Sequence, residues 1–262
     1  MALNSRILLV PHFPALLLDE RNGNECRIQP ALREIGRAFR SEGLEVVVIL
    51  SARWDVEGPF QVDSGGRHKT LVETDGVDLS LAYACDGWTD LAIALHDNGT
   101  ASGLPVEMVH HGMDHGASVP VQFLFPRASC RVVPLSTSER SRDDLRRWGE
   151  IVRETCRGAG AMCAIMTGGS LSYDPAAYLR GEDRPGGVAL DRAVLSRLEA
   201  GDWDGLAALP DDLLAGGRAH AGLRHLWFLE GVLGEPVSGT VLGYHRHPSV
   251  GSALVEFRQP AP

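Results

Sequence analysis

The stretch Arg6-Ile7-Leu8-Leu9-Val10 is a short apolar run that ends at Pro11. An apolar run of this length bounded by proline is typical of a buried strand. Helical spacing of apolar residues follows from Pro30 to Ser41, and a second run, rich in β-branched residues, extends from Glu45 to Leu50. A strand, a helix and another strand in this order, with a crossover of this length, predict parallel strands covered by helices.

The rest of the chain continues this alternation. Further strands are predicted at residues 91–95, 131–135, 161–167, 240–243 and 253–257. Ser138 is predicted to cap a helix that runs to Arg157, and residues 211–232 contain another helix. Residues 174–187, which are rich in Pro, Gly and charge, predict a loop. Since there is no internal repeat and no linker, we expect one α/β domain over residues 1–262, with a mixed, largely parallel central sheet flanked by helices.

Composition excludes several classes of protein. The 262 residues are 44% hydrophobic, enough for a sizeable core. The net charge of -9 disfavours nucleic acid and anionic membrane surfaces as partners. No apolar run approaches the roughly 20 residues of a membrane span, and no signal peptide is recognised, so we expect a cytoplasmic chain. The five cysteines are scattered and predict reduced, mostly buried thiols.

The stretch Gly112-Met113-Asp114-His115-Gly116-Ala117-Ser118-Val119-Pro120 places an imidazole in a turn bounded by glycines. A second pair, His110 and His111, precedes it, and apolar segments follow it. A titratable group on a glycine-supported turn beside a rigid apolar scaffold is where α/β proteins place their chemistry. His115 is therefore a candidate catalytic residue.

Two further candidates follow predicted strands. His12 lies between Pro11 and Pro14 directly after the first strand, and the carboxyl ends of parallel strands line the ligand crevice of such sheets. The alternative is a histidine packed under the prolines. Arg53 follows the second strand, where a guanidinium could bind a carboxylate or phosphate. The alternative for Arg53 is a salt bridge with an acid such as Asp55.

Hydroxyl groups follow the strand predicted at 161–167, in Gly168-Gly169-Ser170-Leu171-Ser172-Tyr173. Backbone N–H groups of such a segment could bind an oxyanion, and Tyr173 could donate a proton; a tight structural turn is the alternative. His220 has small neighbours that permit close approach, although a lone helical histidine is usually a surface or core residue. His245 and His247 predict an exposed turn and not a site.

Together these segments resemble the class III extradiol ring-cleavage dioxygenases and their Memo-like relatives in the AmmeMemoRadiSam protein B group. The matching segments are 10–14, 51–54, 114–120 with Pro126, 133–136, 169–173, 222–226 and 231–234. These segments have the order and spacing of the family and extend over most of the chain. The Asp-His-Gly segment and the C-terminal segment are the most specific, and the resemblance implies the same α/β fold.

The resemblance also implies a site. In the catalytic family two histidines and one glutamate hold Fe(II), with open positions for a catecholate and O₂. His12 matches the first metal histidine, Arg53 stands where the second is expected, and His220 stands near the expected glutamate. His115 matches the substrate-side histidine, and Tyr173 stands where many members have the acid/base histidine.

Three of these positions depart from the family pattern. A permanently charged arginine such as Arg53 cannot ligate a cation and would repel it. His12 and His220 remain as candidate metal ligands, but two neutral imidazoles without a carboxylate should hold Fe(II) weakly. His110 or His111 could complete such a site.

Three functions are therefore kept open. The first is a dioxygenase-like, non-haem Fe(II) oxidoreductase that cleaves the ring of a catechol or aminophenol. The second is a metal-independent enzyme in which Arg53 binds an anionic substrate group and His12, His115 and Tyr173 perform acid/base catalysis. Ser170 and Ser172 are further candidate substrate-binding residues. The third is a non-catalytic subunit of a dioxygenase complex.

Two structural expectations follow. The residues predicted to converge on one cleft at the strand ends are His12, Arg53, His115, Tyr173 and His220. We also expect a homodimer, or a heteromer with a related subunit, because one helix face cannot bury the row Trp227-Phe228-Leu229 alone. The expected ligand is a small aromatic or anionic molecule.

Overall fold

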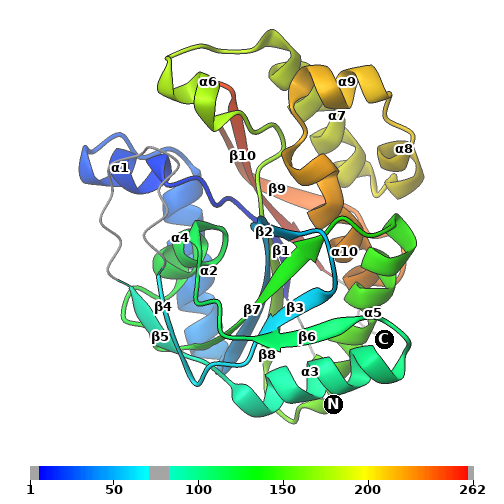
Figure 1. The fold of residues 1–262 in the computed structure, drawn as a ribbon. Coiled ribbons are helices and arrows are strands. Elements are labelled where there is room, and N and C mark those ends of the chain that lie inside the picture. Colours follow the sequence, from blue (N-terminus) through cyan, green and yellow to red (C-terminus); the bar gives the residue numbers. More distant parts are fainter. Residues whose placement is uncertain (1–5, 71–82, 259–262) are drawn as a thin grey trace.

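The computed structural model describes residues 6–70 and 83–258, and its centre is one large sheet (Figure 1). The strands of this sheet are β1 Ile7–Val10, β2 Val46–Val56, β3 Phe60–Asp63, β6 Val106–Val109, β7 Arg131–Ser138, β8 Cys163–Gly168, β9 Gly239–His247 and β10 Val250–Phe257. Their order is β6-β3-β7-β2-β8-β1-β10-β9. The central strands β7, β2, β8 and β1 are parallel, whereas β3 and β10 run antiparallel to their central neighbours. The predicted mixed, largely parallel sheet is confirmed.

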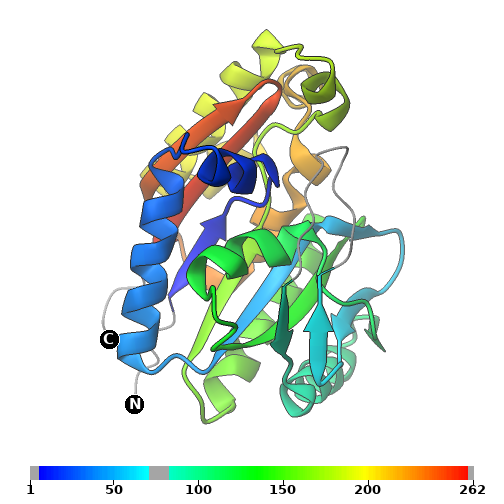
Figure 2. The same cartoon turned by 90° about the vertical axis from the view of Figure 1, so that its left-hand side faces the viewer.

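Helices cover both faces of this sheet (Figures 1 and 2). They are α1 Ala15–Arg21, α2 Ile28–Glu42, α3 Thr89–Ala101, α4 His115–Leu124, α5 Arg142–Gly158, α6 Pro175–Leu179, α7 Pro185–Ala200, α8 Trp203–Ala207, α9 Asp211–Gly217, the 3₁₀ turn η1 His220–Leu223, and α10 Arg224–Leu233. Helices α2 and α4 pack together on one face, and α3, α5 and α10 lie on the other. A small second sheet pairs β4 Arg67–Lys69 with β5 Ala84–Asp86.

Both faces of the central strands are apolar because both are covered. In β1, Ile7 and Leu9 join the core that includes α5 and α10. Leu8 and Val10 join the core that includes α2 and α4. Side chains alternate between the two faces of a strand, so a strand covered on both sides has a continuous apolar sequence. The run at residues 7–10 is of this kind.

The strand predicted at residues 91–95 and the helix cap predicted at Ser138 are wrong. Residues 91–95, predicted as a strand, lie inside α3, where Leu91, Ala92 and Leu95 are buried at helical spacing. A short apolar run does not distinguish a buried strand from one face of a helix. Ser138 belongs to β7 and does not cap α5. The cap is Ser141, whose hydroxyl accepts a hydrogen bond from the backbone N–H of Asp144 at 3.1 Å.

The loop predicted at 174–187 is partly helical. Asp174 caps the short helix α6 by accepting a hydrogen bond from the N–H of Ala177 at 3.0 Å, and Pro175 occupies the first turn. The exposed turn predicted at His245 and His247 is also wrong. Both residues belong to β9, where they pair with Ser252 and Val250 of β10, and His247 is buried.

The argument for a second subunit has no basis in the structure. Phe228 and Leu229 are fully buried within the chain, because α10 packs between α5 and the sheet. The guanidinium of Arg142 lies 4.7 Å from the ring centre of Trp227 and covers it. The oligomeric state therefore stays a prediction.

The cysteines match their prediction, since all five are free thiols and four of them are buried. Of the helices in residues 6–70 and 83–258, none combines the length and the apolar character that a membrane crossing needs.

Candidate functional site

The candidate site forms at one edge of the sheet. Strands β2, β8 and β1 are parallel neighbours, so the segments that follow them emerge side by side. His12 follows β1 after one proline, and Ser170 follows β8 after Gly169. The backbone N–H of Gly169 donates to the carbonyl of Val10 at 3.1 Å, which ties the two strand ends together.

Four aromatic rings meet here, and His12 is at their centre. Its ring centre lies 4.7 Å from that of His220 and 5.3 Å from that of His115, and both rings are nearly parallel to it. Tyr173 lies 5.0 Å from His12 and 4.3 Å from His220. His12 and His115 are fully buried, and Tyr173 is half-buried. We call these four residues the ring cluster.

Ser170 fixes two members of the ring cluster. Its hydroxyl lies 3.2 Å from Nδ1 of His12, and its backbone N–H donates to Nδ1 of His220 at 3.1 Å. Because Nδ1 of His220 accepts a hydrogen bond, a neutral His220 carries its proton on Nε2. Ser170 therefore contacts two rings of the cluster and sets the tautomer of one imidazole, while its role in substrate binding stays a prediction.

The hydroxyl of Tyr173 lies 3.5 Å from Nε2 of His115. This distance is long for a hydrogen bond between a hydroxyl and a ring nitrogen. Catalytic hydrogen bonds are often long without substrate and shorten when it binds. The pair is therefore placed so that one oxygen atom of a ligand could contact both groups and exchange a proton with either.

Helix α4 brings His115 to the cluster. His115 is the first residue of this helix and does not lie in a glycine-bounded turn, so that prediction is wrong. The carboxylate of Asp114 caps the helix by accepting from the N–H of Ala117, and it also accepts from the hydroxyl of Ser51 in β2. The cap thus fixes the start of α4 against the sheet.

Two glycines allow this close packing. A Cβ atom on Gly116 would lie 1.8 Å from Oγ of Ser51, and a Cβ atom on Gly168 would lie 1.9 Å from the carbonyl oxygen of Gly116. Neither position can hold a side chain without a shift of the backbone. Glycine in the Asp-His-Gly segment therefore serves the contact between α4 and the strands, not a turn.

A strained segment positions His220. Ala221, Gly222 and Leu223 have φ values of 47°, 58° and 61°, so three consecutive residues lie in the left-handed region. This conformation is unfavourable for alanine and leucine, and such strain is found most often at functional sites. It makes the chain turn sharply between His220, which starts η1 rather than lying in a regular helix, and His225 in α10.

The sequence prediction missed His225. Its ring centre lies 5.8 Å from that of His220, and it is fully buried. Within the described residues neither of its ring nitrogens has a hydrogen-bond partner. Burial, assisted by the charge of Arg224, lowers its pKa to about 3. The signal was present, since His225 lies in the matching segment 222–226, but no role was assigned to it.

Arg53 lies on β2, which is irregular between Ser51 and Asp55. The hydroxyl of Ser51 accepts a hydrogen bond from the N–H of Arg53 at 3.2 Å. The pKa of His220 is lowered chiefly by burial, and the positive charge of Arg53 adds to the effect. Asp55, the acid considered as a partner of Arg53, is ion-paired with Arg224.

A family model described as the catalytic LigB subunit of aromatic ring-opening dioxygenase matches residues 6–255. The chain belongs to the LigB family. A crystal structure of an uncharacterized protein from Escherichia coli K12 is similar, with a TM-score of 0.71 and 16% sequence identity over 96% of this chain and 99% of that one. At this identity the likeness concerns the fold alone. The comparison with curated proteins gave no match.

Membership of the LigB family confirms the resemblance found in the sequence, and with it the extradiol dioxygenase-like fold. The roles assigned to single residues are not settled by family membership and stay predictions. The structure brings His12, His115, Tyr173 and His220 into ring contact, and the charge of Arg53 acts on His220.

The iron ion that the LigB family suggests does not fit the ring cluster. A histidine that binds a metal through Nε2 usually donates its Nδ1–H to an acceptor, whereas Nδ1 of His220 accepts a hydrogen bond. The groups whose charges lower the pKa of His220 are all basic, namely His12, His225, His115 and Arg53. In the part of the chain that the structure describes, the cluster does not bring three ligand atoms within 4.8 Å of one another.

Other predicted residues lie outside the ring cluster. Ser172 accepts a hydrogen bond from Arg246 at 3.0 Å and donates through its N–H and hydroxyl to the carboxylate of Asp191. It therefore belongs to a second polar network, and we do not carry it into the proposed site. The ring of His111 stacks on Trp54 at 3.9 Å, and His110 is exposed, so neither completes a metal site with His12.

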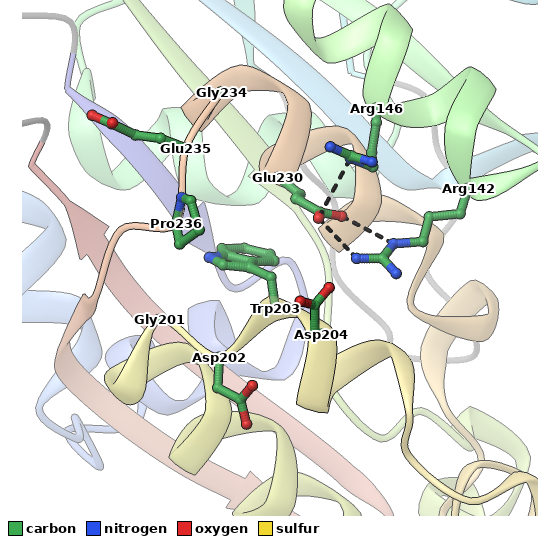
Figure 3. Close-up of a pocket in the computed structure, with 10 residues that line it drawn as sticks. All are labelled: Arg142, Arg146, Gly201, Asp202, Trp203, Asp204, Glu230, Gly234, Glu235 and Pro236. Atoms are coloured by element: carbon green, nitrogen blue, oxygen red, sulfur yellow. Dashed lines mark hydrogen bonds and ion pairs between the residues drawn. The ribbon is translucent and has the colours of Figure 1, made fainter.

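A pocket of about 270 Å³ lies away from the ring cluster, beside α5, α8 and the end of α10 (Figure 3). Arg142 and Arg146 both pair with Glu230 at its wall. The indole N–H of Trp203 is buried there without a hydrogen-bond partner among the described residues. None of the residues predicted from the sequence as site residues lines this pocket.

The buried histidine His225 predicts that the fold loses stability in acid. Its pKa of about 3 in the folded chain lies below the value of about 6.5 for a free imidazole, so the unfolded chain binds the proton first as the pH falls. Above pH ~6.5 the neutral His225 makes its full contribution to the free energy of unfolding. Below that pH the free energy decreases by about 1.4 kcal/mol per pH unit. Urea unfolding measures the free energy of unfolding at pH 7.5 and at pH 5. The loss of this free energy between the two pH values should be about 2 kcal/mol smaller in a His225→Leu variant than in the wild type. Equal pH dependence in the two proteins would contradict a neutral, buried His225.

Proposed function

We propose that this LigB-family chain acts on a small aromatic substrate that carries an acidic group, and that Tyr173 and His115 transfer its protons. The observation that carries the proposal is the approach of the Tyr173 hydroxyl to within 3.5 Å of Nε2 of His115, beside the buried ring of His12. The family description, which names an aromatic ring-opening dioxygenase, supports an aromatic substrate.

Arg53 is the residue that we assign to the acidic group. It is partly exposed, and its charge acts on His220 of the ring cluster. A guanidinium presents its N–H groups in a fixed fork that matches a carboxylate, and such charge-assisted hydrogen bonds contribute about 1.5–3 kcal/mol. A substrate with a carboxylate should therefore bind more tightly than the same ring without one.

The proton would move from a phenolic oxygen of the substrate to Nε2 of His115. The hydroxyl of Tyr173 would then donate a hydrogen bond to the phenolate that remains. The ring of His12 stacks on that of His115 and lies tilted against that of Tyr173, and Ser170 contacts His12 at Nδ1. Burial of the ring cluster excludes water, which strengthens each of these interactions.

A second candidate is ring opening with O₂, which the match to the LigB family over residues 6–255 favours. We place it second because the donors of the ring cluster do not fit an ordinary ferrous site, and we derive no step through iron. The third alternative is a non-catalytic subunit that binds the ligand without reaction. An experiment has to distinguish this alternative from proton transfer.

Binding of 3,4-dihydroxybenzoate and of catechol tests the proposal. Arg53→Met should weaken binding of 3,4-dihydroxybenzoate at least about tenfold, the equivalent of about 1.4 kcal/mol, and should change binding of catechol little. Isothermal titration calorimetry measures both affinities. Equal losses for the two ligands, or none, would contradict the role of Arg53.

A His115→Gln variant separates proton transfer from binding. Ultraviolet difference spectra at neutral pH should detect the phenolate form of catechol bound to the wild type and the phenol form bound to His115→Gln. The preference for 3,4-dihydroxybenzoate should survive in this variant, since Arg53 is intact. A wild type that binds catechol only as the phenol would favour the non-catalytic alternative.

A further inference from the structure

We propose that Asp19, His245 and His247 form a binding site for one divalent transition-metal ion such as Zn²⁺. Each residue offers one ligand atom, and the three atoms lie within 4.8 Å of one another. Two imidazoles and one carboxylate are a common donor set for such ions. The site is separate from the ring cluster and does not depend on the proposed function.

The distances suit an ion. Nε2 of His247 lies 2.8 Å from Oδ2 of Asp19, and Nε2 of His245 lies 4.0 Å from the same oxygen. Ligands at about 2.0–2.2 Å from a tetrahedral ion are separated from one another by roughly 3.4 Å. The two observed separations lie on either side of this value, so small side-chain rotations suffice to bind the ion.

Strand β9 explains why the two histidines face the same way. Side chains two residues apart on a strand point to the same side of the sheet, and His245 and His247 both point toward Asp19 of α1. The intervening residue, Arg246, points to the opposite side and pairs with Asp191. The alternation of side chains along β9 therefore places both histidines on the side of the strand where Asp19 lies.

His247 can offer Nε2 to a metal in a way that His220 cannot. In His220 the proton is held on Nε2 because Nδ1 accepts the N–H of Ser170. In His247 no described residue makes a hydrogen bond with Nδ1. Its proton can therefore move to Nδ1, which leaves the lone pair of Nε2 for the ion.

The surroundings admit an ion and hold the ligands in place. The side chains of His245 and Asp19 are 32% and 24% exposed, whereas that of His247 is 9% exposed. The rings of Phe13 and Tyr178 pack edge-on against His247, at 5.3 Å and 6.0 Å between ring centres. One ligand is thus fixed by packing, and two are reachable from solvent.

Phe13 contacts one residue of each site. Its ring is edge-on to that of Tyr173 at 6.1 Å and to that of His247 at 5.3 Å. The two sites share no ligand residue. Variants at the two sites should have separate effects on metal binding.

Zinc titration of the untagged, full-length protein tests the site. Isothermal titration calorimetry after chelator treatment should give one Zn²⁺ per chain. Asp19→Asn and His245→Gln should each weaken this binding at least tenfold. Visible absorption of the Co²⁺-loaded protein should show tetrahedral or five-coordinate bands in the wild type that both variants lose.

Two control variants make the result specific. His96 forms a similar contact with Asp97, Nδ1 to Oδ1 at 2.8 Å, on the distant helix α3, so His96→Gln should leave zinc affinity unchanged. His12→Gln in the ring cluster should also leave it unchanged. The proposal is overturned if no saturable binding occurs at micromolar Zn²⁺, or if binding survives both Asp19→Asn and His245→Gln.

Discussion

Gly168→Ala should destabilise the folded chain by about 3 kcal/mol or more, as expected for overpacking against backbone atoms. The added Cβ atom would lie 1.9 Å from the carbonyl oxygen of Gly116, and a backbone atom cannot move aside as the end of a flexible side chain can. Relief of the clash requires α4 to move away from β8. Urea unfolding at neutral pH measures the loss of free energy.

Gly158→Ala is the matched control. A Cβ atom on Gly158, at the end of α5, would have no atom within 4 Å. Its effect on stability should stay within about 1 kcal/mol of the wild type, because only helix propensity and chain entropy change. If the two alanine variants were equally stable, the close contact between Gly168 and Gly116 would not be a constraint on the fold.

Fe(II) should not bind stoichiometrically at the ring cluster of the wild type, whereas Arg53→His combined with His220→Glu should raise the affinity at least a hundredfold. The double variant removes a cation and supplies the missing carboxylate. At an effective dielectric constant of about 20, repulsion between a dication and a guanidinium about 5 Å apart is several kcal/mol. Anaerobic loading, desalting and iron analysis measure the difference.

This measurement is best made in proteins that also carry Asp19→Asn, so that iron at the second candidate site is not counted. A contrary result would be one iron per chain in the Asp19→Asn protein that His12→Gln and His220→Gln each abolish. Such iron would mean that the tautomer of His220 changes on metal binding and that Arg53 moves away. Ring opening with O₂ would then become the first candidate function.

The sheet could be predicted from the sequence because its central strands are covered on both faces. Continuous apolar runs such as 7–10 and 46–50 leave few alternatives when Pro or polar residues bound them. The same signal failed at 91–95, where the run forms one face of α3. The turn predicted at Gly116 was wrong for another reason. A glycine required for close packing cannot be distinguished by sequence from a glycine required for a turn.

The residues of the site that directly follow a strand could be predicted from the sequence. His12 and Ser170 come directly after β1 and β8, and parallel strands bring such residues together without further information. His247 was misjudged because its partner Asp19 is 228 residues away in sequence. His225 was missed because a polar residue among apolar ones at a helix start has the same pattern whether it serves packing or chemistry.

Strand β9 carries polar networks on both of its faces. His245 and His247 face Asp19, while Tyr244 and Arg246 face Asp191, which also binds the backbone N–H and hydroxyl of Ser172. Ser172 directly precedes Tyr173 in the chain. Strand β9 therefore holds the proposed metal ligands on one face and, through Asp191, the neighbour of Tyr173 on the other.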